Sequence, residues 1–361
     1  MKYQNVCLES FACTLPDEIV STETLEKQLE PVYSRLRLPA GRLELLTGIT
    51  ERRVWNKGTT IGAQSTITAR KLIQQSGVNP KHIGALIHGS VCRDYLEPAT
   101  ACGVHSALSA EFGLPQTGFV YDVSNACLGI MSGIIQIADK IELGHIKAGI
   151  VVGTENSRAL METTIRHLNT DLSITRKSIK TEFASLTIGS GSAAVLLVHK
   201  SISKTGNKLL GGAAIAKTEH CALCRSVPEH NSTAGDEPSM NPLMQTDSET
   251  LMKEGVAAAA KTFEEFLSEV QWRREDIEVT FCHQVGKAHQ QLLFETLQLP
   301  PEINFSTIQY LGNTGSAALP TAAAIGTEKG IANGKRVALL GIGSGINVIM
   351  LGVEWNKTLT G

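Results

Sequence analysis

Short apolar runs alternate with longer stretches of helical periodicity along most of the chain. In the first half, helical stretches lie near 100–111 and 127–143. The apolar runs around them predict strands at Ala85–Val91, Phe119–Val123, Gly149–Gly153 and Ser192–Val198. Because these runs are almost continuously apolar and alternate with helices, they predict a parallel sheet that helices cover on both faces.

The second half of the chain repeats this order. Its pattern predicts strands at Ile277–Cys282 and Val337–Gly341, and helices at Gly286–Thr296 and Gly315–Gly330. The halves also match locally: residues 81–90 resemble residues 275–284, and residues 144–153 resemble residues 334–343. The repetition predicts a duplicated unit.

Two stacked α/β halves of about 150 to 200 residues each fit the length of the chain. We place the N-terminal half at 1–205 and the C-terminal half at 206–361. The polar stretch Ser226–Thr250 contains three prolines and shows little periodicity. It is therefore expected to be an insertion or a cap on the core.

Composition and charge narrow the class of protein. Hydrophobic residues make up 42% of the chain and charged residues 19%, which is ordinary for a globular protein with a large core. A net charge of −2 without a basic block argues against nucleic-acid binding. The first residues do not read as a signal peptide, and the apolar stretches are too short or interrupted to span a bilayer. We expect a soluble, cytoplasmic protein.

The eight cysteines are scattered and lie mostly in apolar surroundings. This arrangement favours reduced thiols over a disulfide framework. Cys221 and Cys224 form a lone C-x-x-C motif without a second pair at zinc spacing. We therefore expect no metal site.

Cys127 lies where a predicted strand is followed by a nearly all-apolar helix. Its small neighbours, among them Ala126 and Gly129, leave room for a substrate carbonyl to approach the sulfur. Most cysteines are small buried hydrophobes, but the unpaired N–H groups and the dipole at a helix start favour a thiolate. The position predicts a nucleophile whose own backbone N–H helps to hold an oxyanion.

Two later segments carry groups that suit such a nucleophile. His283 directly follows a predicted strand, in the kind of loop where open α/β sheets place ligands. The alternative is a core histidine with both nitrogens paired. Asn313 lies in a tight loop between Gly312 and Gly315, where the alternative is a plain helix N-cap. We predict that the His283 N–H and the Asn313 amide point at a thioester carbonyl.

A Gly-rich turn, Gly341–Asn347, lies between two terminal strands. It lacks the lysine and the following helix that a phosphate-binding loop requires. We predict instead that the backbone N–H of Ser344 completes the oxyanion hole beside Cys127.

In this order and spacing, the motifs resemble the thiolase superfamily. The resemblance rests on Asn125-Ala-Cys127, His283-Gln-Val, Gly312-Asn-Thr-Gly-Ser and the terminal Gly-Ile-Gly-Ser-Gly. Gly48-Ile-Thr-Glu-Arg-Arg53 is also similar to a segment of the β-ketoacyl-ACP synthase III branch. The resemblance runs essentially end to end. It implies an α/β, five-layered αβαβα fold built from two duplicated halves, usually a homodimer, with CoA or phosphopantetheine thioesters as substrates and no cofactor.

One further segment, Arg93-Asp-Tyr-Leu-Glu97-Pro-Ala-Thr, is similar to the head-to-head condensing enzymes of long-chain olefin biosynthesis. In that family the matching glutamate reaches the partner subunit's active site as a base, a role that the resemblance assigns to Glu97. Taken alone, Glu97 would be a solvated loop carboxylate. The implied reaction is a Claisen condensation of two acyl thioesters, carried by CoA or an acyl carrier protein, through an acyl-Cys127 intermediate.

Other functions stay open at this point. A malonyl donor forms its carbanion by losing CO2 and needs no carboxylate base, as in decarboxylative synthase III enzymes, whereas an ordinary acyl thioester must lose an α-proton. Synthases that join two β-ketoacyl chains on carrier proteins form a related group. A catalytically silent partner subunit would usually lack part of the Cys–His–Asn set. Residues 42–47 lack the Trp that synthase III enzymes carry at the CoA entrance. The CoA-contacting residues of those enzymes therefore cannot be assigned to positions of this chain.

Overall fold

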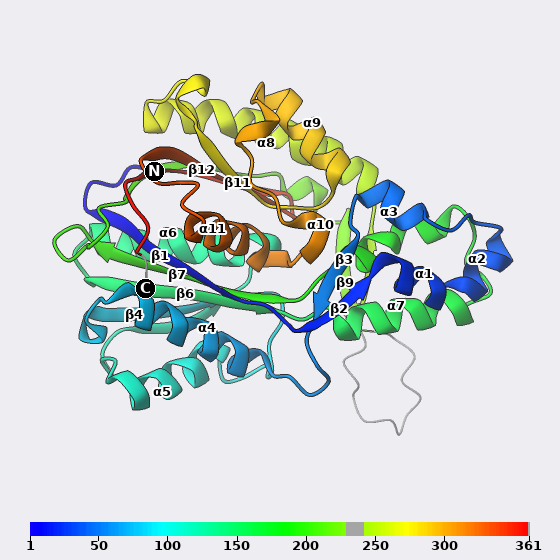
Figure 1. Ribbon diagram of the computed structural model, residues 1–361, viewed down its shortest axis with the longest axis horizontal. Helices are drawn as coiled ribbons and strands as arrows, with labels where there is room; N and C mark the ends of the chain where they lie inside the picture. The colour runs from blue at the N-terminus through cyan, green and yellow to red at the C-terminus, as the bar shows by residue number, and fades with distance from the viewer. Residues whose placement is uncertain (229–241, 360–361) are drawn as a thin grey trace.

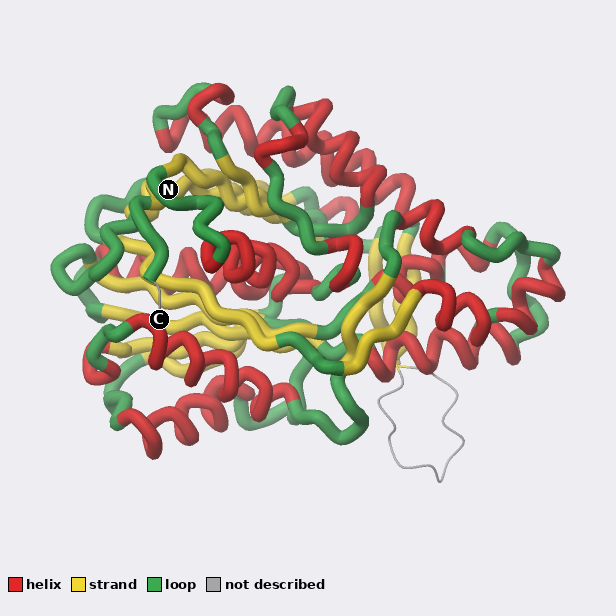
Figure 2. The backbone as a smooth tube through the Cα atoms, in the orientation of Figure 1, coloured by secondary structure: helices red, strands yellow, loops and turns green. Residues whose placement is uncertain are grey.

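Two sheets face each other, with helices between them and on both outer sides (Figure 1). The computed structural model describes residues 1–228 and 242–359. Nine strands are hydrogen-bonded in the order β11-β12-β13-β8-β1-β7-β6-β4-β5. β1 and β8 meet through a single pair, Cys7 and Lys208, so the strands divide there into an N-terminal and a C-terminal sheet. Figure 2 shows the resulting layers, which are the five-layered arrangement predicted above.

The N-terminal sheet and its helices come from the first 199 residues. In chain order these elements are β1 (Val6–Thr14), α4 (Ile61–Ser76), β4 (Ile83–Gly89), α5 (Thr100–Phe112), β5 (Phe119–Val123), α6 (Gly129–Glu142), β6 (Ala148–Glu155) and β7 (Gly191–His199). Helices α4 and α5 cover the outer face of the sheet, and α6 lies on its inner face (Figure 1).

The second half repeats this succession of elements. They are β8 (Lys208–Ala216), α8 (Ser248–Val270), β11 (Val279–Cys282), α9 (Lys287–Leu297), α11 (Ala318–Glu328), β12 (Lys335–Gly343) and β13 (Asn347–Trp355). A single bridge between Asn304 and Thr280 stands where β5 lies in the first half. Helices α8 and α9 are on the outside, and α11 packs beside α6 between the sheets (Figure 1). The duplication read from the sequence is therefore confirmed.

The expected parallel sheet is only partly correct. β4 pairs in parallel with β5 and β6, and β11 pairs in parallel with β12. β7 runs antiparallel to both β1 and β6, and β13 runs antiparallel to both β12 and β8. A strand that is apolar throughout is buried on both faces. Helices on both sides of a sheet bury parallel and antiparallel strands alike, so the pattern does not indicate the direction of a strand.

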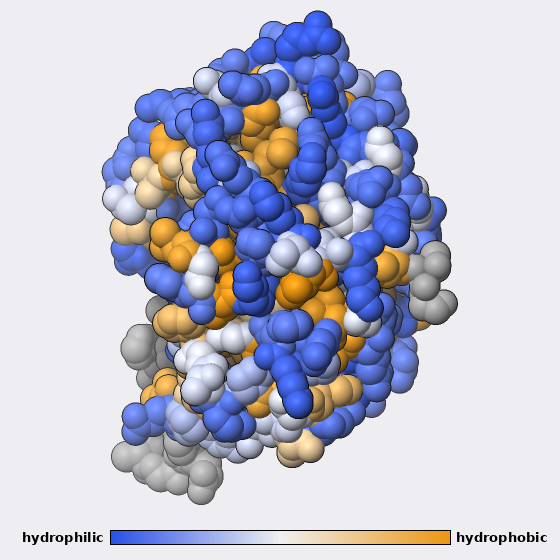
Figure 3. All heavy atoms as spheres, turned by 90° about the vertical axis from the view of Figure 1, so that its left-hand side faces the viewer, coloured by the Kyte–Doolittle hydropathy of each residue, from blue (hydrophilic) through white to orange (hydrophobic). Residues whose placement is uncertain are grey.

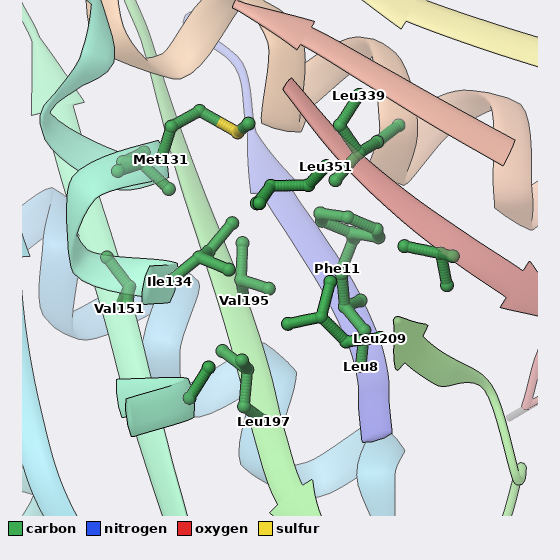
Figure 4. Packing of buried hydrophobic residues seen from close by; sticks show 14 of the residues in the cluster. Leu8, Phe11, Met131, Ile134, Val151, Val195, Leu197, Leu209, Leu339 and Leu351 are labelled. Carbon is green, nitrogen blue, oxygen red and sulfur yellow. The ribbon is translucent and has the colours of Figure 1, made fainter. Parts of the chain in front are cut away.

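The hydrophobic core has one section between the sheets and one under each outer helix layer. Helix α6, which is nearly all apolar in sequence, is buried on most sides and belongs to the middle section. Figure 4 shows that section, where side chains of α6 meet those of both sheets. The labelled residues are Leu8, Phe11, Met131, Ile134, Val151, Val195, Leu197, Leu209, Leu339 and Leu351.

A group of smaller elements forms a cap at one end of the sheets, with its own hydrophobic cluster. These elements are β2 (Glu18–Ser21), α1 (Thr22–Gln28), α2 (Glu30–Leu36), α3 (Arg42–Thr47), β3 (Glu51–Val54) and α7 (Arg158–Thr170). The opposite end is largely hydrophilic, with small apolar areas between polar side chains (Figure 3). Within residues 1–228 and 242–359, no helix is long and apolar enough to cross a membrane.

The polar stretch Ser226–Thr250 is more regular than expected where it is described. Its ends belong to an antiparallel pair, β9 (Cys224–Pro228) with β10 (Pro242–Thr246), and to the start of α8. Residues 229–241 lie outside the described residues. The β9–β10 pair is a separate sheet outside the nine-stranded one, as an insertion or a cap would be, whereas the start of α8 belongs to the main fold.

Close backbone packing positions the start of α6. A Cβ atom on Gly89, the last residue of β4, would lie 2.5 Å from the carbonyl carbon of Gly129, the first residue of α6. A Cβ on Gly153 of β6 would lie 2.3 Å from the Gly89 carbonyl oxygen. Three glycines therefore let β4, β6 and α6 touch through their backbones, directly behind the turn that carries Cys127.

We expect Gly89→Ala to lower the free energy of unfolding by about 1 to 3 kcal/mol, because backbone rather than a flexible side chain must move. Gly103→Ala on α5 is the matched control, since no atom lies within 4 Å of its added Cβ. It should raise stability by up to about 1 kcal/mol through helix propensity. Urea titration measures both. Equal stability of Gly89→Ala and the unsubstituted protein would contradict the packing argument.

Candidate active site

Cys127 lies in a turn between β5 and α6. The turn is a one-turn 3-10 helix, Ala126–Leu128, and α6 itself begins only at Gly129. The Leu128 N–H donates to the Asn125 carbonyl at 2.8 Å. Ala126 has a φ of 43°, a left-handed conformation that costs a non-glycine residue on the order of 1 kcal/mol or more. The predicted helix start is therefore shifted by two residues, and the nucleophile lies in a tight, constrained turn.

The surroundings of Cys127 do not favour a thiolate in the resting protein. Burial raises the pKa of the Cys127 thiol to about 12, and the Glu155 carboxylate acts in the same direction. The expectation that the helix start favours the thiolate is therefore wrong for the free protein. Removing an anionic sulfur from water outweighs the dipole because the turn lies between the two sheets.

This pKa has a consequence for alkylation. We expect the rate at which iodoacetamide modifies Cys127 to rise about tenfold per pH unit from pH 7 to 10, because only the growing thiolate fraction reacts. Modification is followed on the Cys127 peptide by mass spectrometry, since Cys102 and Cys221 are exposed and also react. A plateau between pH 6 and 8 would reveal a thiolate already stabilised in the resting protein.

His283 follows β11 directly, as predicted, and its backbone N–H donates to the Leu340 carbonyl of β12 at 2.9 Å. The side chain is 5% exposed. Burial lowers its pKa to about 3, and His289 contributes a smaller effect in the same direction, so the ring is neutral at pH 7. Its Nδ1 atom is buried and has no hydrogen-bond partner among the described residues. The alternative of a core histidine with both nitrogens paired to protein groups therefore finds no support among the described residues.

Asn313 lies between α10 (Ile308–Leu311) and the 3-10 turn Gly315–Ala317. Its backbone N–H donates to the Thr187 carbonyl, and its carbonyl accepts from the Gly189 N–H, both at 2.9 Å. The side-chain Oδ1 accepts from the Gly315 N–H at 3.0 Å. Asn313 thus holds the N–H of the first residue of this turn, although the N-cap position itself belongs to Thr314, and it uses only the oxygen of its amide. Because the amide oxygen faces Gly315, the N–H2 group faces the opposite way and is available to donate a hydrogen bond to another group.

The turn that contains Ser344 lies against the Cys127 turn. A Cβ built on Gly343, at the end of β12, would lie 3.6 Å from the backbone nitrogen of Cys127. Asn347, at the start of β13, donates from Nδ2 to Asn125 Oδ1 at 3.0 Å. These contacts bring the Ser344 segment beside the nucleophile, where the sequence places the second oxyanion donor.

Glu155 is a buried carboxylate of this region that sequence reasoning missed. It ends β6 and accepts hydrogen bonds from the Val91 N–H at 3.1 Å and from Ser316 Oγ at 2.5 Å. Burial raises its pKa. Glu155 thus connects the loop after β4 to the loop that contains Asn313, and its charge acts on Cys127. The sequence contained one sign of this residue, namely an acidic side chain at the end of an otherwise apolar strand.

Glu97 lies apart from these groups in the single chain. It is exposed in the loop between β4 and α5, and no described contact joins it to Cys127, His283 or Asn313. Large apolar side chains are exposed in the same loop: Val91 is 52%, Tyr95 69% and Leu96 93% exposed. Such a group of exposed apolar residues is typical of a surface that another protein covers.

The described side chains do not form a metal-binding site. Within the two described ranges, no three or more His, Cys, Asp or Glu side chains gather where they could hold a metal ion. Cys221 and Cys224 are both free thiols. The loops that follow β5, β11 and α10 carry a thiol, a neutral imidazole and a carboxamide, and the Gly315–Ala317 turn after Asn313 contacts the turn that contains Cys127.

Comparison with known proteins agrees with this arrangement. Residues 47–214 match the family model for the thiolase N-terminal domain. Residues 267–355 match the model for the C-terminal domain of 3-oxoacyl-[acyl-carrier-protein] synthase III. Fold and site together therefore define a condensing acyltransferase of the thiolase superfamily.

The curated relatives give the family within this class. An acyl-CoA:acyl-CoA alkyltransferase of Shewanella oneidensis is 41% identical over 98% of this chain and 100% of its own length. One of Xanthomonas campestris is 30% identical, with the same coverage. A β-ketoacyl-ACP synthase III of Clostridium tetani is 24% identical over 98% of this chain and all of its own length. The chain belongs to the acyl-CoA:acyl-CoA alkyltransferase family, whose solved members are called OleA.

Solved structures agree with this family. Crystal structures of Xanthomonas campestris OleA superpose with TM-scores of 0.88 and 0.89 at 30% identity. They cover 98% of this chain and at least 98% of the OleA chain. They include variants in which a glutamate, a cysteine or a histidine is replaced. In one further structure the OleA protein holds lauric acid and lauroyl-CoA.

Proposed function

We propose that this protein joins two acyl-CoA molecules head to head in a Claisen condensation that does not release CO2 from a malonyl donor. The observation that carries the proposal is the combination of Cys127, neutral His283 and an oriented Asn313 amide, in the loops that follow β5, β11 and α10. The acyl-CoA:acyl-CoA alkyltransferase relatives, which match the whole length of the chain, support it.

The first half of the reaction transfers an acyl group to the enzyme. The Cys127 sulfur attacks the carbonyl carbon of an acyl-CoA, and the backbone N–H groups of Cys127 and Ser344 hold the oxyanion. The carbon–sulfur bond to CoA then breaks. CoA leaves as a thiol, carrying the proton that the Cys127 thiol has lost, and acyl-Cys127 remains.

The second half forms the carbon–carbon bond. A second acyl-CoA places its carbonyl oxygen between the His283 N–H and the Asn313 Nδ2–H2, which stabilise the enolate that forms when the α-proton is removed. The α-carbon attacks the carbonyl carbon of acyl-Cys127, and the Cys127–carbon bond breaks. The product is a β-ketoacyl-CoA branched at its α-carbon. The thiolate of Cys127 recovers a proton, which closes the cycle.

We further propose that Glu97 supplies the base for the other subunit of a homodimer. In the single chain Glu97 is exposed, and it lies in a loop with exposed Tyr95 and Leu96. A two-fold interface over this loop covers these side chains and carries Glu97 of the partner subunit toward Cys127. Removal of an α-proton from an unactivated acyl thioester needs such a positioned base.

Subunit mixing tests both the chemistry and the arrangement. Cys127→Ala and Glu97→Gln are each expected to be inactive, but a mixture that exchanges subunits should recover about a quarter of the unsubstituted activity. Half of the dimers then contain one chain of each kind, and each mixed dimer has one complete site out of two. A mixture as inactive as its components, with exchange shown by native mass spectrometry, would place Glu97 and Cys127 in the same subunit or remove Glu97 from the mechanism.

We also infer that the protein acts in the cytoplasm. All eight cysteines are free, and free thiols are typical of a reducing compartment. The acyl groups are proposed to arrive on CoA, as the names of the relatives indicate. An acyl carrier protein as the donor is the alternative.

A further inference from the structure

A small cavity lies on the side of His283 that faces α9. Its lining includes His283, Gln284, His289 and Asn304, but neither Cys127 nor Asn313. The space in it for the centre of a water molecule is about 10 Å³. This volume corresponds to a single water molecule, and a buried site holds one only when two to four polar groups face it.

Three nitrogen atoms of the lining residues supply this polarity. His283 Nδ1, Gln284 Nε2 and Asn304 Nδ2 are each buried without a hydrogen-bond partner among residues 1–228 and 242–359. A buried polar group without a partner costs about 1 to 3 kcal/mol, and few such groups occur in native proteins. Three of them at one water-sized cavity therefore point to a molecule that satisfies all three.

The orientation of both amides follows from their other hydrogen bonds. Gln284 Oε1 accepts from the backbone N–H of Thr307 at 2.7 Å. Because a backbone N–H can only donate, the amide oxygen must face Thr307, and the N–H2 group must face the opposite way. Asn304 Oδ1 accepts from Thr280 Oγ1 at 3.2 Å, and Nδ2 of the same amide is the atom without a partner. Both free amide groups are therefore donors.

We infer that one water molecule accepts hydrogen bonds from Gln284 Nε2 and Asn304 Nδ2 and donates one to His283 Nδ1, so that the neutral imidazole carries its hydrogen on Nε2. The two amides use both lone pairs of the water, which leaves it only O–H groups to offer. His283 Nδ1 must then be an acceptor. The second O–H is left for His289, which lines the same cavity.

This arrangement gives Gln284 and Asn304 the role of positioning residues, and in this respect the inference rests on the proposed function. The condensation needs an N–H on the side of His283 that faces the thioester. A neutral histidine has only one N–H. With that hydrogen on Nδ1, the ring would present a lone pair to the carbonyl oxygen and destabilise the enolate.

The experiment reads the tautomer directly. The full-length protein is labelled with 15N-histidine, and the ring nitrogens of His283 are assigned by their loss in His283→Asn. We expect the unsubstituted protein to show the hydrogen on Nε2. Asn304→Leu removes one of the two donors, and we expect it to populate the Nδ1–H form and to slow condensation about 10-fold or more, while formation of acyl-Cys127 changes far less.

Thr280→Val is the matched control for Asn304→Leu. It removes the same Thr280–Asn304 hydrogen bond but keeps the Asn304 N–H2 group at the cavity, so the hydrogen is expected to remain on Nε2. If Asn304→Leu does not fold, Gln284→Glu takes its place, because it keeps an acceptor for Thr307 and replaces the N–H2 donor. Loss of the Nε2–H form in either variant supports the inference.

Two results would overturn the inference. One is a hydrogen on Nδ1 in the unsubstituted protein, and the other is a tautomer unchanged in both variants. Neither depends on turnover. If the unsubstituted protein forms no condensation product, the proposed function fails, while the tautomer measurement still decides whether the water is present.

Discussion

Cys127→Ala should abolish condensation, with a loss of about 10³-fold or more, because no other group can form the acyl-enzyme. The variant should also take up no acyl group from acyl-CoA. Both effects are measured by mass spectrometry, the first on extracted products and the second on the intact protein. The turn leaves space for the smaller side chain, so the melting temperature should change little.

Cys13→Ala is the matched control. Its thiol is also shielded from water, which raises its pKa to about 11, but it lies on β1, away from the described site residues. It should keep its activity and still take up one acyl group. Continued condensation by folded Cys127→Ala would remove Cys127 from the mechanism and with it the account of the two half-reactions.

Glu97→Gln should lower condensation of two acyl-CoA molecules by about 10²- to 10⁴-fold, the range that a positioned general base contributes. The amide keeps the shape of the side chain but cannot take the α-proton. Acylation of Cys127 needs no such base, so the burst of CoA released with acyl-Cys127 formation should persist. A stopped assay for free CoA separates this burst from steady turnover.

Glu111→Gln on α5 serves as the control carboxylate, because Glu111 is also surface-exposed and pairs only with Arg70 among the described side chains. It should leave both half-reactions unchanged. If Glu97→Gln behaves like Glu111→Gln, the base lies elsewhere. Glu155, the buried carboxylate whose charge acts on Cys127, is then the next residue to replace.

The elements that position the site could be predicted because their signals are local. β5 was placed at its observed bounds, Phe119–Val123, from its own composition. The duplicated halves were visible because both carry the same succession of apolar runs and loops. Cys127 and His283 were predicted because each lies in a loop that follows a strand, where open α/β sheets place ligands.

Other properties of the site depend on residues that are distant in the sequence. The pKa of Cys127 is set by burial between two sheets and by Glu155, so the local helix start gave the wrong direction. The orientation of the Asn313 amide depends on the Gly315 N–H. The cavity behind His283 joins β11 to Asn304, and no motif in the sequence connects these segments.

Glu97 differs from the other site residues in that a single chain cannot show its role. Its loop is exposed, and its apolar neighbours lack a covering surface within the described residues. The resemblance to head-to-head condensing enzymes assigned its function, whereas its own sequence context indicated only a loop carboxylate. Its assignment as the base therefore has to be tested by the activity of the proposed dimer and not by the structure of one chain.

Product analysis by mass spectrometry, after incubation of the pure protein with myristoyl-CoA, tests the central claim most directly. We expect 2-myristoyl-myristoyl-CoA from myristoyl-CoA alone, together with the β-keto acid that forms when water hydrolyses this thioester, or the ketone that forms when that acid loses CO2. The same incubation with malonyl-ACP added is the comparison. Product that forms only when malonyl-ACP is present would contradict the account, because the carbanion would then arise by decarboxylation and Glu97 would be a loop carboxylate without a role in the reaction.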